Sequence, residues 1–553
     1  MYVKRKQKII IGVSLLVIAC LLAAGTYVYI EYYAKKKETP ITQSTNTTID
    51  PRISPLCTQG LILEVNRIRD RDIVKVMMKS GNAWKTKPQF YYIAKIDNVE
   101  QISKDIQATA GASNEQLFNT WDTMFQENKM SAQVQQEQEK SDVTLSIMER
   151  VPVGILGNRY QDEERDKIQV TYDYRTGRWS GSDSFNDSDG YGHYNGTTFE
   201  VWFNIYQTDY NHDGIPYWTE VNVYHLDPTV THVTDDPNHD GIPIPWDWKW
   251  GFNPFANDGH AQQDPDHDGL TNLEEYQMRK YYANPYHQDV YLEIDNMQKK
   301  NAFDVNHKLY PETPEFMMER YAQHNICLYI DSGWPDSPAN GGGQYVPYYQ
   351  VISQDSGMML QFYNHYFPDD RKGIFRYAII ANSAGFSHPA VFNMYDCMAI
   401  STHYNIVYSL GRKAFNERTK ILAQTSEVMH ELGHTMGIRH ETVPGNDNFS
   451  YTEGKAQKQA FIDAWGNYKS VMNYYYFWVY SVVDYSDGSH GAGDNNDWAD
   501  IHQNMSYFNR EAKEIEQPPP ITNAVNAFVP RGILYTDIPP LHNLNSLKIL
   551  SRL

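Results

Sequence analysis

The stretch from His430 to His440 constrains this chain of 553 residues more than any other, because it follows the pattern H-E-x-x-H-x-x-G-x-x-H. On a helix, His430 and His434 lie one turn apart on the same face and can bind the same metal ion. Gly437 can adopt a positive φ, which would end the helix and let His440 return as a third ligand. Three protein ligands with a fourth position left for water are typical of catalytic zinc.

Glu431 lies next to the first histidine, where its carboxylate could accept a proton from a metal-bound water. Residues at helical spacing around it form a mostly apolar stripe on the side of the helix away from His430. They are Ile421, Leu422, Thr425, Val428, Met429 and Leu432. Taken singly, a histidine and a glycine also suit an ordinary helix C-terminus. That alternative does not account for the glutamate and three histidines together, so the sequence predicts one catalytic Zn²⁺.

A second motif follows at Ser470 to Tyr474, which reads S-x-M-x-Y. With it, the sequence resembles the metzincin clan of zinc endopeptidases, in which such a turn follows the zinc motif. The resemblance implies three zinc ligands: His430, His434 and His440. It also implies that Glu431 is the general base and acid, and that Met472 forms an apolar floor beneath the histidines. Tyr474 would stabilise the oxyanion, a role that not every metzincin gives this tyrosine. Core packing is the alternative for Met472 and the tyrosines.

The resemblance covers roughly residues 289–510, where strands and helices alternate. Apolar, β-type runs predict strands at 290–294, 326–330 and 375–380, and helical spacing predicts a helix at 314–325. A long helix from about Lys413 would carry the zinc motif. In metzincins one edge of such a sheet pairs with an extended peptide substrate, and we expect that edge near residues 387–401.

Between Asp209 and Glu275 a twelve-residue pattern occurs three times, with starts 27 and 28 residues apart. Each copy reads D-x-[DN]-x-D-G and has a carboxylate at position 12, the oxygen spacing of a calcium loop. The predicted ligands are Asp209, Asn211, Asp213, Ile215 and Glu220; Asp236, Asn238, Asp240, Ile242 and Asp247; and Asp264, Asp266, Asp268, Leu270 and Glu275. We expect two to three structural Ca²⁺ ions, because the second copy has aspartate at position 12.

Asp-Gly surface turns are the alternative explanation of these loops, but three copies in register argue against it. Prolines around the loops leave little room for regular flanking helices. They are Pro216, Pro237, Pro243, Pro245 and Pro265. The segment therefore resembles thrombospondin type 3 repeats more than EF-hands, and the resemblance implies a stalk that calcium stiffens.

Ile9 to Ile30 is a run of 22 uncharged residues that follows four basic ones. As a helix it would be about 33 Å long, enough to cross a bilayer. We expect a transmembrane signal anchor at 9–30, a cytoplasmic N-terminus at 1–8, and a single-pass cell-membrane protein whose catalytic domain is extracellular. A cleaved signal peptide, which would give a secreted protein, is the alternative.

The length predicts several domains, and the 41% of hydrophobic residues supplies their cores. The predicted class is multidomain α+β. The predicted segments after the anchor are a linker at 31–56, a partly β ectodomain of unknown role at 57–203, calcium repeats at 204–286, a zinc metalloprotease domain at 287–517, and a tail at 518–553. Within the ectodomain we expect one or two helices between Gln101 and Glu149. Cys327 and Cys397 could form a disulfide.

The net charge of −20 argues against nucleic acid as a partner. The predicted function is that of a membrane-anchored extracellular zinc endopeptidase that hydrolyses peptide or protein substrates. One alternative is a calcium-dependent adhesion or surface-binding protein with an inactive protease domain, which the intact Glu431 disfavours. Another is zinc-dependent hydrolysis of a non-peptide bond.

Overall fold

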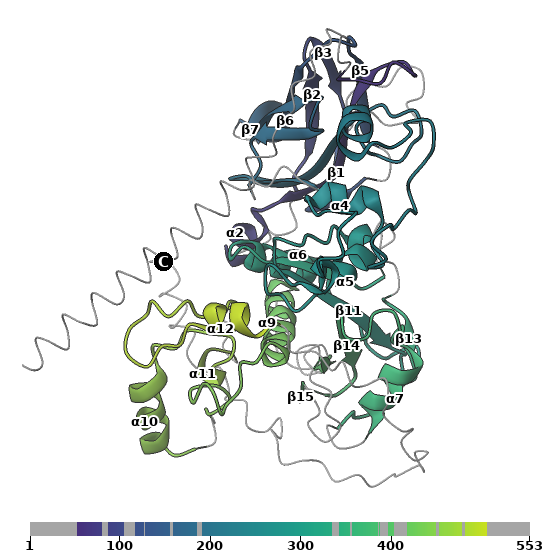
Figure 1. Cartoon of the computed structure of the whole chain (residues 1–553). Coiled ribbons are helices and arrows are strands. Elements are labelled where there is room, and N and C mark those ends of the chain that lie inside the picture. The colour runs from purple at the N-terminus through teal and green to yellow at the C-terminus, as the bar shows by residue number, and fades with distance from the viewer. Residues whose placement is uncertain are drawn as a thin grey trace, which may run out of the picture. The chain divides into compact units, whose positions relative to one another are not determined.

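The structure of the protein is a computed structural model, shown in Figure 1. It describes residues 52–79, 87–103, 117–125, 128–154, 159–184, 191–333, 342–353, 357–384, 386–387, 396–402, 417–449, 453–477 and 482–505. All of them belong to one of the two units of the chain, Pro51–Leu553.

A six-stranded sheet forms the centre of the C-terminal half (Figure 1). Its strands are β11 (Asp289–Met297), β12 (Cys327–Asp331), β13 (Tyr345–Val346), β14 (Phe375–Ala381), β15 (Phe386–Ser387) and β16 (Cys397–Ser401). The order is β12-β11-β14-β16-β15, and β13 pairs with the end of β11. All pairs are parallel except that β15 runs antiparallel to β16 at the edge. Every residue of β14 is buried, as expected for a parallel strand covered on both faces.

Helices cover both faces of this sheet. Those of the C-terminal half are α6 (Glu312–Ala322), α7 (Met358–His365), α9 (Glu417–Thr435), α10 (Lys455–Trp465), α11 (Tyr474–Phe477) and α12 (Asp497–Asn504). Because successive strand side chains point to opposite faces, Val290 and Leu292 pack in one core with α6 and α9. Tyr291 packs in a second core with α7. The predicted strands and the helix at 314–325 are confirmed, with the helix beginning two residues earlier.

Two antiparallel sheets make up the N-terminal part. The first contains β1 (Gly60–Asp70), β4 (Asp122–Met124), β5 (Lys129–Gln133), β9 (Gly192–Asn195) and β10 (Phe199–Gln207). The second contains β2 (Phe90–Ile96), β3 (Val99–Ile102), β6 (Lys140–Val153), β7 (Arg159–Asp173) and β8 (Arg178–Gly181). One hydrophobic core takes residues from both sheets, so their apolar faces pack together. The short helix α2 (Ile73–Met78) follows β1 and packs on α6.

The repeat segment between these parts has only short helices. They are α3 (Tyr217–Thr219), η2 (Glu220–Tyr224), α4 (Ile244–Trp250), η3 (His260–Gln262), α5 (Asn272–Met278) and η4 (Arg279–Tyr281). Its small core is aromatic and centres on Trp246 and Trp250. Among the described residues of this segment no long helix flanks a loop, as the prolines around the loops predicted.

The predicted helices between Gln101 and Glu149 are wrong for the described residues, which form β4, β5 and most of β6 instead. Residues 104–116 lie outside the description. Leu117, Trp121, Met124 and Phe125 have helical spacing, but Met124 pairs with Arg67 of β1. Cross-strand partners decided the structure here, since strand formation depends on tertiary context more than on local pattern.

The predicted transmembrane helix at 9–30 is corrected. Among the residues that the structure describes, no helix is both long and apolar enough to cross a membrane. The longest of them, α9, has 19 residues but carries several charged side chains, which are costly in a hydrocarbon core. Residues 9–30, and the N-terminus predicted to be cytoplasmic, lie outside the description. We therefore do not retain the single-pass anchor, the membrane as a partner, or the cell-membrane localisation of an extracellular catalytic domain.

The several sheets and helices establish a mixed α and β chain, as predicted at this coarse level. The exact domain boundaries stay predictions, and the tail at 518–553 lies outside the described residues. Cys327 and Cys397 are both free thiols, so they do not pair.

A buried charge network joins β1 to α6. Arg69 lies between Glu200 and Glu319, and all three side chains are 2% exposed. We expect Arg69→Met to lower the free energy of unfolding by about 3 kcal/mol, because it removes the buried cation that the two carboxylates share and leaves Glu319 only Arg71 and Glu200 only His193. Arg165→Met, in a surface pair with Glu149, should cost less than about 1 kcal/mol. Urea unfolding midpoints measure both, and equal effects would contradict the expectation.

Candidate metal centres

Helix α9 carries the first two histidines and the glutamate of the zinc motif. His430, Glu431 and His434 are buried, while Met429 and Leu432 on the same helix pack into the core shared with α6. The helix ends at Thr435. Gly437 follows with a φ of 86°, the left-handed turn that the sequence predicted.

Each motif histidine directs its Nδ1 atom at a main-chain carbonyl. For His430, His434 and His440 the partners are the oxygens of Val471, Ile438 and Asn446, at 2.9, 2.7 and 3.1 Å. A carbonyl only accepts hydrogen bonds, so Nδ1 carries the hydrogen in each ring and Nε2 remains for a metal ion or a proton. Histidine ligands of metals are commonly oriented in this way.

The Nε2 atoms of His430 and His434 are 3.1 Å apart. Two ligands about 2.0–2.1 Å from a tetrahedral zinc ion are separated by about 3.3 Å. Two nitrogen lone pairs this close repel each other unless a proton or a cation lies between them. The pair therefore fits one zinc ion.

Asp447 is the third member of this cluster, and the sequence interpretation did not include it. Its Oδ1 is 3.1 Å from Nε2 of His430 and its Oδ2 is 3.2 Å from Nε2 of His434. The three ligand atoms lie within 4.8 Å of one another. His440 is exposed on the loop after α9, bonded to Asn446 next to this aspartate. An aspartate at a variable distance from the motif carries no spacing signal, so only the fold reveals it.

The cluster is strongly coupled electrostatically. Burial alone would lower the pKa of His430, but Asp447, the neighbouring Glu431 and the Val471 carbonyl raise it to about 9. Burial would raise the pKa of Asp447, yet the two histidines lower it well below its usual range. Without metal, a proton on the imidazole therefore compensates the carboxylate.

The turn at Ser470 to Tyr474 forms hydrogen bonds with two residues of this cluster. Val471 accepts the hydrogen bond of His430, and the Met472 carbonyl accepts one from the backbone of Asp447 at 3.2 Å. Met472 is fully buried. A side chain added at Gly433 would meet its sulfur at 2.7 Å, so the methionine packs directly against α9.

The buried Asp497 fixes that turn. Its carboxylate accepts hydrogen bonds from the hydroxyls of Ser470 and Tyr468 and from the backbone of Ser486. The serine of the S-x-M-x-Y motif thus has a structural role: it links the turn to the N-terminus of α12.

Tyr474, the last residue of the motif, also contacts the cluster. Its ring stacks on His430 with 5.3 Å between centroids. Burial, followed by the nearby Asp447 and Glu431 carboxylates, raises its pKa well above the usual value. The phenol therefore stays protonated and can act as a hydrogen-bond donor.

The three repeat loops share one backbone geometry. The histidine at position 4 is left-handed in each, with φ of 61° at His212, 58° at His239 and 64° at His267. In each loop the glycine at position 6 donates to the aspartate at position 1, at 2.7, 2.9 and 3.0 Å. In each, the residue at position 7 donates to the aspartate at position 5, at 2.9, 2.9 and 2.7 Å. The sequence repeat is therefore also a structural repeat.

The position-12 carboxylates point inward. Glu220, Asp247 and Glu275 are at most 1% exposed. Burial raises the pKa of Glu220 to about 8, with the other acids of its loop adding to the effect. A carboxylate is buried without a cation only at a cost, so the loops fit ions with oxygen ligands.

The third loop has the densest negative charge. Asp264, Asp266 and Asp268 offer ligand oxygens within 4.8 Å of one another. Both oxygens of Glu275 are buried without a hydrogen-bond partner. Asp289, the first residue of β11, adds a fifth carboxylate, which lies outside the predicted loop, and its backbone donates to Asp268 at 2.9 Å. Burial and mutual repulsion raise the pKa of Glu275 and Asp289 well above the usual values.

The second loop differs, because a histidine side chain enters it. His260 lies near Asp240 and Asp247, and the three ligand atoms are within 4.8 Å of one another. The repeat pattern does not include this residue, which follows the loop's last position by 13 residues.

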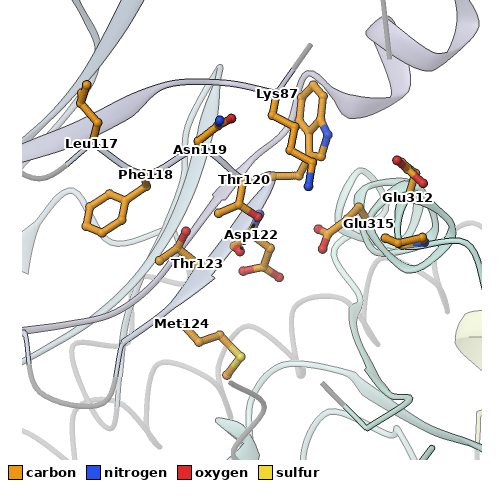
Figure 2. A pocket seen from close by; sticks show the side chains of 12 residues that line it. Lys87, Leu117, Phe118, Asn119, Thr120, Asp122, Thr123, Met124, Glu312 and Glu315 are labelled. Atoms are coloured by element: carbon orange, nitrogen blue, oxygen red, sulfur yellow. Dashed lines mark hydrogen bonds between the residues drawn. The ribbon is translucent and has the colours of Figure 1, made fainter. Parts of the chain in front are cut away.

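Two further features could hold a ligand: a pocket and a buried cluster of three side chains. A pocket of about 440 Å³ lies between the segment around β4 and α6 and is lined by Phe118, Trp121 and Glu315 among others (Figure 2). None of the predicted catalytic or metal-binding residues lines it. The histidine cluster, whose donor atoms converge, is therefore the stronger candidate site.

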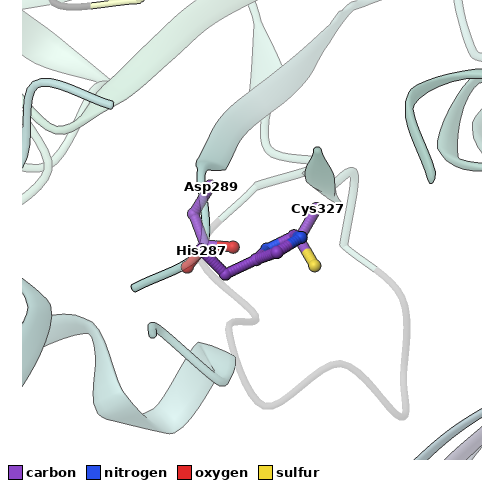
Figure 3. A group of neighbouring side chains, drawn as sticks. All are labelled: His287, Asp289 and Cys327. Atoms are coloured by element: carbon purple, nitrogen blue, oxygen red, sulfur yellow. The ribbon is translucent and has the colours of Figure 1, made fainter. Parts of the chain in front are cut away.

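The second group is His287, Asp289 and Cys327, which lie side by side and buried (Figure 3). Burial lowers the pKa of His287 to about 3 and raises that of the Cys327 thiol well above its usual value. Imidazole and thiol are thus both neutral, and we interpret the group as buried packing beside the third loop.

No family model and no curated protein matches this sequence. A solved structure described as "CC2D1B coordinates ESRCT-III activity during the mitotic reformation of the nuclear envelope" aligns with 33% of this chain and 71% of its own, at 12% identity. Its TM-score is 0.17, so the likeness carries no argument about fold or function.

The pairing of His430 with Asp447 predicts how stability depends on pH in zinc-free protein. A histidine pKa raised from about 6.5 in the unfolded chain to about 9 stabilises the fold fully below pH 6.5. That stability, up to about 3 kcal/mol, is lost as the pH rises through 9. We expect Asp447→Asn to remove most of this pH dependence in urea unfolding, whereas Asp463→Asn on the exposed face of α10 should retain it. An unchanged pH slope in Asp447→Asn would contradict the pairing.

The buried carboxylates predict calcium-dependent stability. Addition of Ca²⁺ should raise the melting temperature, because binding to the folded state alone stabilises it. Glu275→Gln should weaken calcium binding at the third loop at least about tenfold, because it removes the bidentate ligand. Glu274→Gln is the matched control, since glutamine can keep the capping contact with Thr271. Calorimetry and calcium titration measure both variants, and equal affinities would contradict the assignment.

Proposed function

We propose that the chain is a zinc-dependent endopeptidase with a metzincin-like catalytic region. The observation that carries the proposal is the convergence of His430 and His434 on one point, with their Nε2 atoms 3.1 Å apart and Glu431 beside them on α9. The turn at Met472 supports it, because this turn packs under the helix and bonds the first histidine. The runner-up, a surface-binding protein with an inactive domain, does not require this arrangement.

His430, His434 and His440 would hold the zinc ion, as the resemblance implies, with Asp447 as a further carboxylate within reach of the first two. A bound zinc ion supplies a Lewis acid for the scissile carbonyl and lowers the pKa of a coordinated water to about 7. The residues that hold it are oriented before binding, because each histidine already donates its Nδ1 hydrogen to the backbone.

Glu431 would serve as general base and then general acid. It is the residue after the first ligand on α9, and a carboxylate beside a metal-bound water would accept its proton and return it to the leaving amine. Tyr474 stays protonated and stacks on His430, so its hydroxyl would donate a hydrogen bond to the developing oxyanion.

The sheet edge favours a peptide as substrate. β15 is a two-residue antiparallel edge strand on β16, and its second residue, Ser387, is the first of the region 387–401 where we expected the edge. The backbone of Ser401 in β16 donates to Glu427 of α9 at 2.9 Å, one helical turn before Glu431. An extended peptide that adds to such an edge would therefore lie along the helix that carries the catalytic groups.

The repeats would bind calcium for structural reasons. Their loops share one geometry, and their position-12 carboxylates are buried, so cations would neutralise charge in a segment whose own hydrophobic core is small. We propose calcium in the first and third loops.

The test is peptide cleavage by the full chain supplied with zinc and calcium. Glu431→Gln should retain zinc but lower kcat/KM by about 10²–10⁴-fold, because it removes only the general base. Glu441→Gln changes an exposed glutamate next to His440 and should leave cleavage unchanged. Mass spectrometry of a peptide library measures cleavage, and metal analysis measures zinc. Equal cleavage by wild type and Glu431→Gln would refute the proposal. Zinc binding without cleavage by the wild type would favour the surface-binding alternative.

A further inference from the structure

In the second repeat a histidine nitrogen lies among the carboxylates of the loop. Nε2 of His260 is 3.0 Å from Oδ2 of Asp240, at position 5 of the loop. It is also 3.0 Å from Oδ1 of Asp247, at position 12. The imidazole is 4% exposed and lies between two carboxylates that were predicted to share a calcium ion.

His260 is held in this orientation by contacts on every side. Its Nδ1 is 2.6 Å from Oδ1 of Asp258, which fixes a hydrogen on Nδ1 and turns Nε2 toward the loop, where Nε2 donates a hydrogen to the carboxylates or, with that proton displaced, can bind a metal ion. Its ring stacks on Phe252 with 5.0 Å between centroids and 4° between planes. Asn272 donates to its carbonyl at 2.7 Å. A carboxylate behind a histidine is the usual support of a metal-binding imidazole.

The loop also contains an unused ligand oxygen. Oδ2 of Asp247 is buried without a hydrogen-bond partner, and the residue is fully buried. Leaving such an oxygen unpaired costs about 1–3 kcal/mol or more for a charged group. A metal ion bound by this carboxylate would satisfy it.

Donor chemistry separates this loop from the others. Calcium takes oxygen ligands, whereas imidazole together with carboxylates suits zinc and similar transition-metal ions. We propose that the second repeat binds a transition-metal ion of the zinc class through His260, Asp240 and Asp247, with Asp258 as the supporting carboxylate. The ion would connect the loop to the segment 258–260. The site is separate from the histidines of α9 and does not depend on the peptidase proposal.

The experiment counts zinc in the full chain with calcium in large excess. To separate the two zinc sites, it uses a His434→Ala background, in which the cluster on α9 has lost a ligand. We expect about one zinc ion per chain to remain in this background and to be lost in His434→Ala with His260→Gln. Cobalt provides a second readout, because Co²⁺ bound at the repeat should give a visible absorption spectrum that His260→Gln abolishes.

His239→Asn is the matched control, because His239 is an exposed histidine of the same loop and asparagine tolerates its left-handed backbone. It should keep both the zinc and the spectrum. Asp258→Asn keeps the shape of the site and should lower zinc affinity about 10–100-fold. Because this variant keeps His260, it tests the site even if His260→Gln fails to fold. Equal zinc binding in His434→Ala with and without His260→Gln would overturn the proposal. So would calcium bound at the second loop that excess zinc does not displace.

Discussion

Compensation of buried charge is the constraint on which the rest of this structure depends. The chain removes carboxylates from water at the three repeat loops, on α9 and at the junction of β1 with α6. An isolated buried carboxylate is costly, so each needs a cation or hydrogen-bond donors. At the β1–α6 junction Arg69 supplies the cation from within the chain. At the repeats and at the histidine cluster, we propose that bound metal ions supply it.

The histidine cluster shows how distant parts of the chain combine into one centre. Helix α9 sets the spacing of His430 and His434, but the carbonyl that orients the first comes from Val471 in the turn before α11. The same turn positions Asp447 through the Met472 carbonyl. Asp497 fixes the turn in its place. One network of hydrogen bonds thus joins His430, Asp447, the turn at Met472 and Asp497.

The repeats show that one sequence pattern can give centres of different chemistry. All three loops fold alike, since the same aspartates bond the same backbone positions. Residues outside the pattern then distinguish them. Asp289 adds negative charge beside the third loop, whereas His260 brings nitrogen to the second. The fold thus brings to the second and third loops side chains that a motif of twelve residues cannot contain.

The sequence by itself determined what depends on short-range spacing: the helix that pairs His430 with His434, the turn at Gly437, the three loops, and the strands that became β11, β12 and β14. The prediction from sequence was wrong where the pairing partner is distant. Met124 has the spacing of a helical residue, but it pairs with Arg67 of β1. Only the tertiary structure brought Asp447, Asp258 and His260 to the candidate metal centres, and Asp497 to the turn that begins at Ser470. The physical reason is that ligand geometry within one turn of helix or one loop is fixed by local dihedral angles. Contacts between segments depend instead on packing, which no local pattern encodes.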